Sequence, residues 1–545
     1  MTYYNQSPDP LTYLWLQLDQ NLFRKDSDTA LTAPAPSLER ATFETLDTLV
    51  NRDFDGGFQV ASVTDATGKP LPHTIVKTMM RIDLPAPLAP GKSVVFGVAW
   101  SYNINDAKRL GGRSGYEFFP KDGNYIYEIA QWFPRLAAYN DVSGWQHKQF
   151  LGSGEFTLEF GNYKVRITAP NDHVVGATGV LQNPQAVLSP TQLQRLEQAK
   201  TASAPVLVVT PAEAKTAEAG KPTGTKTWVF HAENVRDFAF ASSRKFIWDA
   251  QGHRSGTQPV LAMSYYPNEG NPLWAQYSTA AIIHTLNLYS RYSFDYPYPI
   301  AISVNGPVGG MEYPMICFNG PRPEPDGTYT ARTKYALISV VIHEVGHNYF
   351  PMIVNTDERQ WTWMDEGINS FLQFLAEQEW EDNYPSRRGE PKNMVEYMVA
   401  PGHDPIMTNS ESVKELGNNA YGKPATALNI LRETVMGREL FDFAFREYSR
   451  RWKFKRPMPA DFFRTMEDAS AIDLDWFWHG WFYTTDHTDL SLDDVRHFTL
   501  DTKNPETEKT LQRQQQTAAP TTLSSERYKD TPKLVEQNPA LADFY

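Results

Sequence analysis

Two histidines in the segment His343-Glu344-Val345-Gly346-His347 are the residues of this 545-residue chain best suited to bind a metal ion. On a helix, residues four positions apart lie about 40° apart around the axis, so both imidazoles can reach the same ion. Glu344 lies about 100° from His343, where it can act on a water molecule beside the ion without being a ligand. The preceding apolar run, Ala336–Ile342, predicts a buried helix, where unpaired imidazoles would be unfavourable. The pattern therefore predicts a catalytic zinc site.

A catalytic zinc ion takes three protein ligands and keeps one position open. Glu366 is the candidate third ligand, and 18 residues separate it from His347. The alternative is a glutamate that only interacts with the dipole at the start of a helix. Asp365 beside it is predicted to be the N-cap of a helix that runs to about Trp380. The predicted ligands of one zinc ion per chain are His343, His347 and Glu366.

Two further motifs lie on either side of these residues. Gly309-Gly310-Met311-Glu312-Tyr313 precedes the histidine helix and is similar to a Gly-x-Met-Glu-Asn motif. Tyr421-Gly422-Lys423-Pro424 follows it and is similar to a Tyr-x-Lys-Gly segment. Together with the histidine pattern and the Trp-Met-Asp-Glu-Gly context of Glu366, these motifs resemble the aminopeptidase N family of gluzincin zinc metallopeptidases. The likeness extends over most of the chain.

The resemblance implies roles for residues beyond the same three zinc ligands. Glu344 would be the general base that activates a zinc-bound water and later passes the proton to the leaving amine. Tyr421 would donate a hydrogen bond to the oxyanion of the tetrahedral intermediate. Glu312, with Gly310 and Met311 in the same motif, would bind the substrate and anchor its free α-amine.

The chain departs from the family pattern close to the predicted site. Tyr313 stands in place of Asn, Tyr349 and Pro351 in place of the Trp and Gly that commonly follow the second histidine, and Pro424 in place of Gly. None of these changes removes a ligand or the base, so they concern the shape of the substrate pocket. The family also uses a Gln or Glu of its β-domain to help bind the amine, and Glu128 and Gln131 are the candidates here.

Strands are predicted in the first third of the chain. The runs Met79–Leu84, Val94–Trp100 and Glu155–Phe160 are apolar or alternating and are bounded by Pro or Gly. Ser189 and Gln192 form a capping-box pattern that predicts the start of a short helix. Residues 210–227 are rich in Ala, Lys, Thr, Gly and Pro and are predicted to be a surface loop.

Helices are predicted to dominate after about residue 235. The fold class is α+β and multidomain, with an N-terminal antiparallel β-domain over residues 1–235. The resemblance implies that this β-domain lacks its first strands. A mainly helical, thermolysin-like catalytic domain over 236–485 and a polar C-terminal extension over 486–545 follow. Residues 503–522 are predicted to be extended or partly disordered. The predicted helices are Trp274–Tyr292, Arg332–Phe350, Ala425–Val435, Phe441–Trp452 and Pro459–Ala469.

Composition excludes several classes of protein. The chain has 51 Lys and Arg against 64 Asp and Glu, a net charge of −13, which argues against a nucleic-acid partner. No apolar run approaches the 18 residues or more of a membrane-spanning helix. The single cysteine, Cys317, excludes an intrachain disulfide and is predicted to be a buried apolar residue. No signal peptide is visible, but with first strands missing the compartment stays open between cytoplasm and periplasm or secretion.

The leading hypothesis is a zinc aminopeptidase that hydrolyses the N-terminal peptide bond of peptides with a free N-terminus. A thermolysin-like endopeptidase is the first alternative, because it shares the zinc site but does not need Glu312 as an amine anchor. The second is a non-catalytic scaffold derived from the family. Such a scaffold is free to lose the ligands or the base, and all of them are present in this chain.

Overall fold

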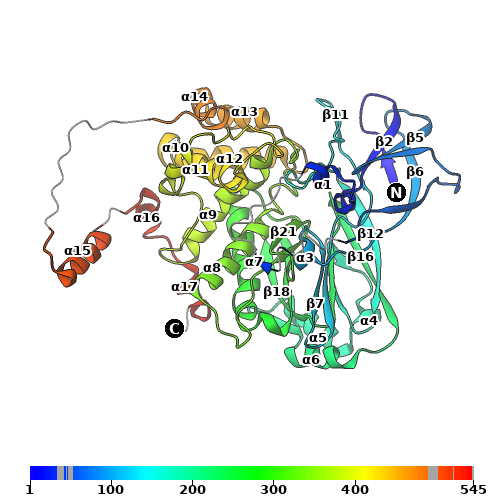
Figure 1. Cartoon of the computed structure of the whole chain (residues 1–545), viewed down its shortest axis with the longest axis horizontal. Helices are drawn as coiled ribbons and strands as arrows, with labels where there is room; N and C mark the ends of the chain where they lie inside the picture. Colours follow the sequence, from blue (N-terminus) through cyan, green and yellow to red (C-terminus); the bar gives the residue numbers. More distant parts are fainter. Residues whose placement is uncertain (33–41, 44–45, 47–52, 489–500, 519–520, 543–545) are drawn as a thin grey trace.

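The computed structural model describes residues 1–32, 42–43, 46, 53–488, 501–518 and 521–542 of the chain. Strands from the first half lie on one side of the molecule and helices from the second half on the other (Figure 1). The first part contains antiparallel sheets with the strand orders β1-β6-β3, β4-β5-β2-β9, β13-β17-β8-β7 and β12-β16-β14. Their strands are β1 (Thr2–Tyr4), β2 (Leu11–Gln17), β3 (Gln59–Asp65), β4 (His73–Val76), β5 (Met79–Leu88), β6 (Ser93–Ser101), β7 (Gly115–Phe119), β8 (Asn124–Ile129), β9 (Arg135–Leu136), β12 (Gly161–Pro170), β13 (Val174–Ala177), β14 (Val180–Leu181), β16 (Thr225–Val235) and β17 (Phe240–Ser243).

Two of the three predicted strands are confirmed, since Met79–Leu84 lies in β5 and Val94–Trp100 in β6. The predicted strand Glu155–Phe160 is wrong. This segment is an irregular loop, and its backbone binds side chains that follow the histidine helix: the amide of Phe156 donates to Glu358 Oε2 at 2.9 Å. Side chains form hydrogen bonds with the backbone of this segment, so it does not need a neighbouring strand as a partner. The regular strand begins only at β12.

The capping box at Ser189 is confirmed and starts α5 (Pro190–Ala199). The predicted loop over 210–227 is wrong, because α6 (Pro211–Gly220) and the start of β16 occupy it. Thr210 and Glu213 form a second capping box at the start of α6. The Thr-x-x-Glu spacing was therefore a helix signal that the composition of the segment concealed.

A six-stranded mixed sheet supports the helical part, with the order β15-β18-β19-β20-β22-β21. The pairs β19–β20 and β20–β22 are parallel, and β21 lies antiparallel to β22 at the edge of the sheet. All six residues of β20 are buried, as expected for a strand covered on both faces. The strands are β15 (Val206–Val209), β18 (Ile247–Ser255), β19 (Gln258–Tyr266), β20 (Ile300–Asn305), β21 (Gly310–Tyr313) and β22 (Ile316–Asn319).

The helical part confirms most of the predicted helices. Its main helices are α7 (Leu273–Tyr292), α8 (Ala331–Gly346), α9 (Ile368–Trp380), α11 (Lys423–Ile430), α12 (Arg438–Trp452) and α13 (Pro459–Ser470). The helix predicted to end at Phe350 ends four residues earlier, at Gly346. A Cβ atom on Gly346 would lie 2.3 Å from the hydroxyl of Tyr289, so this position accepts only glycine where α8 crosses α7.

The polar C-terminal extension is more ordered than predicted. Residues 503–522 include the helix α15 (Pro505–Thr517), so an extended or disordered segment is wrong for those residues. Further along, α16 (Leu523–Tyr528) packs on the helical part, where Tyr528 is buried and Arg527 donates to the carbonyl of Glu433 at 2.6 Å. The boundaries near residues 235 and 485 stay predictions. The pairing of β15 with β18 crosses the first of them.

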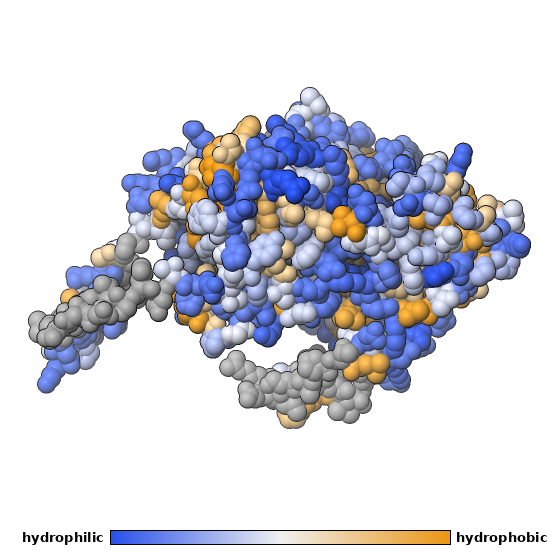
Figure 2. Space-filling model, turned by 90° about the horizontal axis from the view of Figure 1, so that it is seen from above, coloured by the Kyte–Doolittle hydropathy of each residue, from blue (hydrophilic) through white to orange (hydrophobic). Residues whose placement is uncertain are grey.

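Apolar residues form one large core that runs from the sheets into the helices and a smaller one among β2, β3, β5 and β6. Cys317 lies in the large core and is fully buried, as predicted. The face shown in Figure 2 is mainly hydrophilic, with hydrophobic residues in separate small patches. Within the described residues, none of the helices combines the length and apolar character needed to cross a membrane.

Candidate active site

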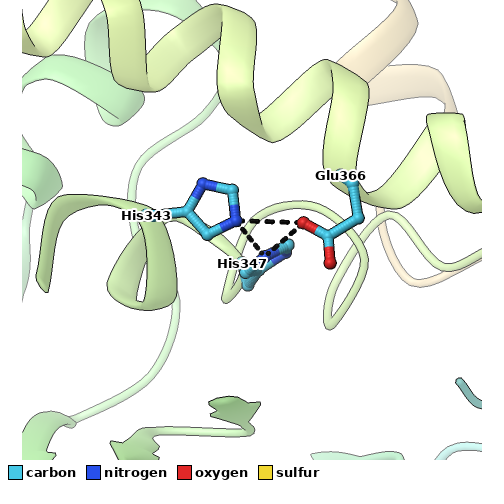
Figure 3. Close-up of side chains that lie close together, drawn as sticks. All are labelled: His343, His347 and Glu366. Atoms are coloured by element: carbon cyan, nitrogen blue, oxygen red, sulfur yellow. Dashed lines mark hydrogen bonds and ion pairs between the residues drawn. The ribbon is translucent and has the colours of Figure 1, made fainter. Parts of the chain in front are cut away.

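Three electron-pair donors converge between α8 and the segment that precedes α9 (Figure 3). Nε2 of His343 lies 3.0 Å from Nε2 of His347 and 2.9 Å from Oε2 of Glu366, and the third side of this triangle is 3.3 Å. All three side chains are buried. His347 follows the last residue of α8 but keeps a helical backbone, so the expected four-residue spacing holds. Glu366 comes from a π-helical turn, η3 (Trp363–Gly367), that leads into α9.

The other nitrogen of each imidazole is held by an oxygen acceptor. Nδ1 of His343 lies 2.8 Å from Oε1 of Gln373, and Nδ1 of His347 lies 2.9 Å from the carbonyl of Phe350. Carbonyl oxygens only accept, so Nδ1 is the protonated nitrogen and Nε2 presents its lone pair to the centre of the triangle. Asp365 adds a carboxylate oxygen 3.0 Å from Nδ1 of His347.

The donor set fits a zinc ion. Three lone pairs facing one another at 2.9–3.3 Å repel unless a cation lies between them. Ligands about 2.0–2.1 Å from a tetrahedral ion are separated from each other by about 3.3–3.4 Å, close to the observed spacing. Two imidazoles and one carboxylate are also a common ligand set of catalytic zinc.

Glu344 and Gly310 lie against each other beside the donors. A Cβ atom on Gly310 would lie 2.8 Å from Oε1 of Glu344, so the edge strand β21 approaches α8 as closely as a glycine permits. Oε2 of Glu344 has no hydrogen-bond partner among the described residues. Burial raises the pKa of this carboxyl to about 8, and a divalent cation beside it would favour the charged form instead.

Tyr421 reaches the site from a second π-helical turn, η5 (Gly417–Gly422). Its hydroxyl donates to Oε1 of Glu366 at 2.6 Å, and its ring stacks at 5.8 Å on that of His343. Burial and the Glu366 carboxylate raise the pKa of the Tyr421 hydroxyl, so the proton stays on the oxygen. The group is thus a hydrogen-bond donor at the edge of the donor triangle.

Glu312 belongs to a buried cluster of carboxyl groups. Its ligand oxygens and those of Glu155, Glu358 and Asp365 all lie within 4.8 Å of one another. Burial and the neighbouring Glu155 raise the pKa of Glu312 well above its usual range. Oxygens of Glu312, Glu155 and Asp365 have no hydrogen-bond partner among the described residues. Arg113 pairs with Glu155, Arg236 with Glu358 and His347 with Asp365, so Glu312 is the member of this cluster without an ion pair among the described residues.

Of the two β-domain residues considered for amine binding, Glu128 is not a member of the Glu312 cluster. Glu128 accepts a hydrogen bond from the amide of Val308 at 2.9 Å, below the loop that leads to β21. Gln131 is buried, and its amide nitrogen has no partner among the described residues. Glu155 is the residue of the N-terminal part that joins the Glu312 cluster. Sequence reasoning missed it because it assigned this glutamate to a strand.

The positions that depart from the family pattern have structural partners. Tyr313 is fully buried, and its hydroxyl donates to the carbonyl of Arg113 at 3.2 Å. Met311, which matches the family pattern, lies beside the same arginine. Tyr349 lies in an aromatic cluster and bonds with the hydroxyl of Ser290 at 2.9 Å. Pro424 packs so closely on η3 that a Cβ on Gly367 would lie 2.5 Å from it.

Asp365 differs from the prediction. It is not a helix cap but a fully buried group inside η3 that pairs with His347, since the helical structure begins before it at Trp363. Gln373 and Arg388, which interact with His343, were also not identified from the sequence. The signal for Gln373 was present, because it lies seven residues after Glu366 and so faces the same side of the helix.

The sequence of this chain is similar to those of known peptidases. The family described as "Peptidase family M1 domain" matches residues 274–481. Glutamyl aminopeptidase of Sus scrofa is 26% identical over 172 residues, which cover 29% of this chain and 18% of that protein. Aminopeptidase M1-A of Oryza sativa subsp. japonica is 22% identical over 232 residues, which cover 40% of this chain and 26% of that protein. The matched segments thus span about a fifth to a quarter of these relatives' own length.

Solved structures resemble almost the whole chain. The M1 zinc metallopeptidase from Deinococcus radiodurans superposes with a TM-score of 0.58 at 14% identity and covers 91% of each chain. A mutant of that enzyme bound to a Tyr-Ser-Ala substrate gives a TM-score of 0.56 at 15% identity over 88% of each chain. These likenesses show a shared two-part fold. The matched domain and its relatives show that this chain is similar to the aminopeptidase N family of gluzincin metallopeptidases, the family of the M1 peptidases.

Proposed function

We propose that this protein is a zinc aminopeptidase that removes residues from the N-terminus of peptides. The observation that carries the proposal is the position of Glu312 beside the donor triangle. Glu312, Glu344 and His347 bring ligand atoms within 4.8 Å of one another, so a carboxyl group lies next to the place where a peptide bond would be cleaved. Such a carboxyl group suits the ammonium of a free N-terminus.

The residues of the chain divide the reaction between them. A zinc ion held by His343, His347 and Glu366 would supply Lewis-acid chemistry, polarising the scissile carbonyl and acidifying water. Glu344 takes a proton from the attacking water and returns it to the departing amine. Tyr421 donates a hydrogen bond to the carbonyl oxygen as negative charge develops on it.

Glu312 and its neighbours position the substrate. An ammonium group that enters this buried pocket loses hydration, and the carboxylates of Glu312 and Glu155 replace the lost water with negative charge. Because the cluster is next to Glu344, the anchored amine leaves room for only one residue before the scissile bond. This geometry favours removal of single residues over cleavage within a chain.

Two other functions have less support. An endopeptidase would have to pass a peptide chain through the pocket that the Glu312 cluster closes with buried charge. A scaffold would not need three converging donors and an adjacent unpartnered carboxylate. The comparisons with known proteins favour neither.

A panel of aminoacyl-arylamides, assayed with and without a chelator, tests the reaction class and the metal together. We expect hydrolysis of free-amine substrates, loss of that activity on metal removal and recovery with zinc. Elemental analysis should give one zinc per chain. Protein without bound transition metal and with chelator-resistant activity would refute the zinc site.

N-acetylated versions of the best substrates test the exopeptidase assignment. Acetylation removes the ammonium and adds bulk where the pocket ends, so kcat/KM should fall by about 100-fold or more, as expected when the scissile carbonyl is misplaced by about 1 Å. Glu312→Gln should reduce the preference for the free amine. Equal kcat/KM for free and acetylated peptides would support the endopeptidase instead.

A further inference from the structure

Arg388 lies beside Tyr421 at the edge of the site. Its guanidinium carbon is 4.1 Å from the ring centroid of Tyr421, and its charge interacts with His343 and Glu344. Glu312 interacts most strongly with Glu155, His347 and Asp365, and the charges of Arg113 and Arg236 also act on it. The site therefore has a guanidinium beside Tyr421 and a cluster of carboxyl groups that includes Glu312.

Arg388 forms no ion pair at contact distance within the described residues, although its charge acts on the carboxyl groups of Glu344 and Glu377. It is half-buried, and among the residues that the structure describes it takes part in no ion pair or side-chain hydrogen bond. Arg387, its neighbour, is exposed. A partly dehydrated guanidinium with five free donors has the fork geometry that binds a carboxylate with two hydrogen bonds.

The backbone beside Arg388 is fixed in place. Gly389 has a φ of +93°, and a Cβ there would lie 2.4 Å from the ring of Phe374 on α9. The carbonyl of Gly389 accepts a hydrogen bond from Asn429 at 3.0 Å. The backbone that carries Arg388 is therefore ordered before a ligand binds, which lowers the entropy lost on binding.

The distance from the donors to Arg388 limits the ligand to a short one. The ring of Tyr421 is 4.1 Å from the guanidinium and 5.8 Å from the ring of His343, so Arg388 lies within about 10 Å of that imidazole. One extended residue spans about 3.3–3.6 Å. With the amine on Glu312 and the first peptide bond at the donors, the carboxylate of a second or third residue reaches Arg388.

We propose that Arg388 binds the C-terminal carboxylate of di- and tripeptides, which makes the enzyme selective for short peptides with both ends free. This inference rests on the proposed peptidase function and adds a second anchor to it. A carboxylate could also come from the side chain of an acidic N-terminal residue. We favour the C-terminus because Arg388 lies against Tyr421, whereas the side chain of the first residue begins at the amine that is anchored on Glu312.

The test compares kcat/KM for Leu-Ala and Leu-Ala-Ala with kcat/KM for the same peptides as C-terminal amides. The wild-type ratio of acid to amide should be about 10–100, the value of a charge-assisted hydrogen-bonded pair. Arg388→Gln should bring the ratio close to one, and Arg388→Lys should keep part of it, since lysine retains the charge without the fork. Arg387→Gln is the matched control and should keep the wild-type ratio.

Each of the following results would contradict the proposal and point to a different explanation. A wild-type ratio of one or below excludes a carboxylate site. An equal fall for acid and amide in Arg388→Gln would mean that Arg388 only positions Tyr421. An effect of Arg388→Gln on Glu-arylamide relative to Gln-arylamide, without an effect on the dipeptides, would assign the side-chain carboxylate instead. If wild-type protein hydrolyses neither these peptides nor Leu-arylamide, the proposed peptidase function itself fails, and this inference with it.

Discussion

Both ring nitrogens of His347 have partners in the structure, and these partners fix the orientation of the imidazole. Nδ1 faces the carbonyl of Phe350 and the carboxyl of Asp365, while Nε2 faces the other two donors. Acceptors behind an imidazole fix its orientation and make it a better ligand. Oε2 of Glu344, by contrast, has no hydrogen-bond partner among the described residues. The same helix turn therefore carries two of the three converging donors and one carboxyl group that is left available for proton transfer.

Substitutions of the two groups that do not belong to the donor triangle should separate metal binding from turnover. Glu344→Gln should keep one zinc per chain and lower kcat by about 10²–10⁴-fold, because the variant cannot accept a proton. Tyr421→Phe should also keep the metal and lower kcat by about 10²–10³-fold through loss of an oxyanion donor. Metal content and steady-state rates give both values.

Tyr483→Phe is a suitable control, since Tyr483 is 49% exposed and lies on another turn of the helical part. Tyr483→Phe should change neither the metal content nor kcat. Near-normal kcat in Tyr421→Phe would remove that tyrosine from the reaction.

At the scale of elements, two π-helical turns bring the last components of the site together. η3 delivers Glu366 and η5 delivers Tyr421, and the turns meet where Gly367 faces Pro424. A π-turn widens the helix and shifts the side chains that follow it, a feature often found at functional sites. The proline that departs from the family pattern is thus part of the contact that aligns Tyr421 with Glu366.

The edge strand β21 approaches α8 closely. Alanine substitutions of the adjacent residues Gly309 and Gly310 should therefore differ sharply in their effect on activity. Gly310→Ala would place a Cβ 2.8 Å from Oε1 of Glu344 and 3.1 Å from Val340, which displaces the base or the strand. A displacement of about 1 Å at the reacting groups can cost about 10²-fold in rate. We expect Gly310→Ala to lose about that much kcat/KM with little change in melting temperature.

Gly309→Ala is the matched control, because its Cβ would meet nothing within 4 Å. It should keep wild-type activity. Equal losses in the two variants would mean that flexibility of the strand, and not its distance from Glu344, limits the reaction.

At the scale of the whole molecule, buried charged groups join the strand-rich and helical parts. Arg236 pairs with Glu358, and Arg359 reaches Asp19 at 3.1 Å, so residues after the histidine helix bind the beginning of the chain. These groups are fully or almost fully buried. Breaking one partner of such a pair leaves an uncompensated charge, which is why the two parts should unfold together.

Asp249 gives the stability of the whole molecule a predictable dependence on pH. It is buried between β18 and α7, where Tyr266 donates to it at 2.9 Å and Thr279 at 2.5 Å. Burial raises its pKa from 3.8 to about 7. The folded state therefore holds the proton between these values while the unfolded state releases it. This contribution to stability is complete below pH 4 and is lost as pH rises through 7.

The change amounts to at most about 4 kcal/mol in the free energy of unfolding. Asp249→Asn cannot ionise, so its stability relative to wild type should increase steadily from pH 4 to pH 8. Denaturation midpoints across that range measure the difference. Asp530→Asn, at an exposed position, should parallel wild type. A difference between Asp249→Asn and wild type that does not change with pH would show that Asp249 is ionised throughout.

The sequence by itself determined the features that local geometry imposes. Helical periodicity places His343 and His347 on one side of α8, and the apolar run before them requires that the helix be buried. Capping pairs fix the start of α5 and α6 for the same local reason. The spacing and the resemblance of the motifs to a known family then predicted Glu366 as the third ligand and Glu312 as the amine anchor.

Only the tertiary structure decided which residues join these motifs from far along the chain. Glu155 meets Glu312 across 157 positions, and its loop forms no strand because Glu358 satisfies the backbone instead. Arg388 reaches Tyr421 because Gly389 packs on α9. Such contacts follow from how sheets and helices pack, and no spacing or periodicity in the sequence encodes them, since a residue's partners across the core depend on every element placed between them.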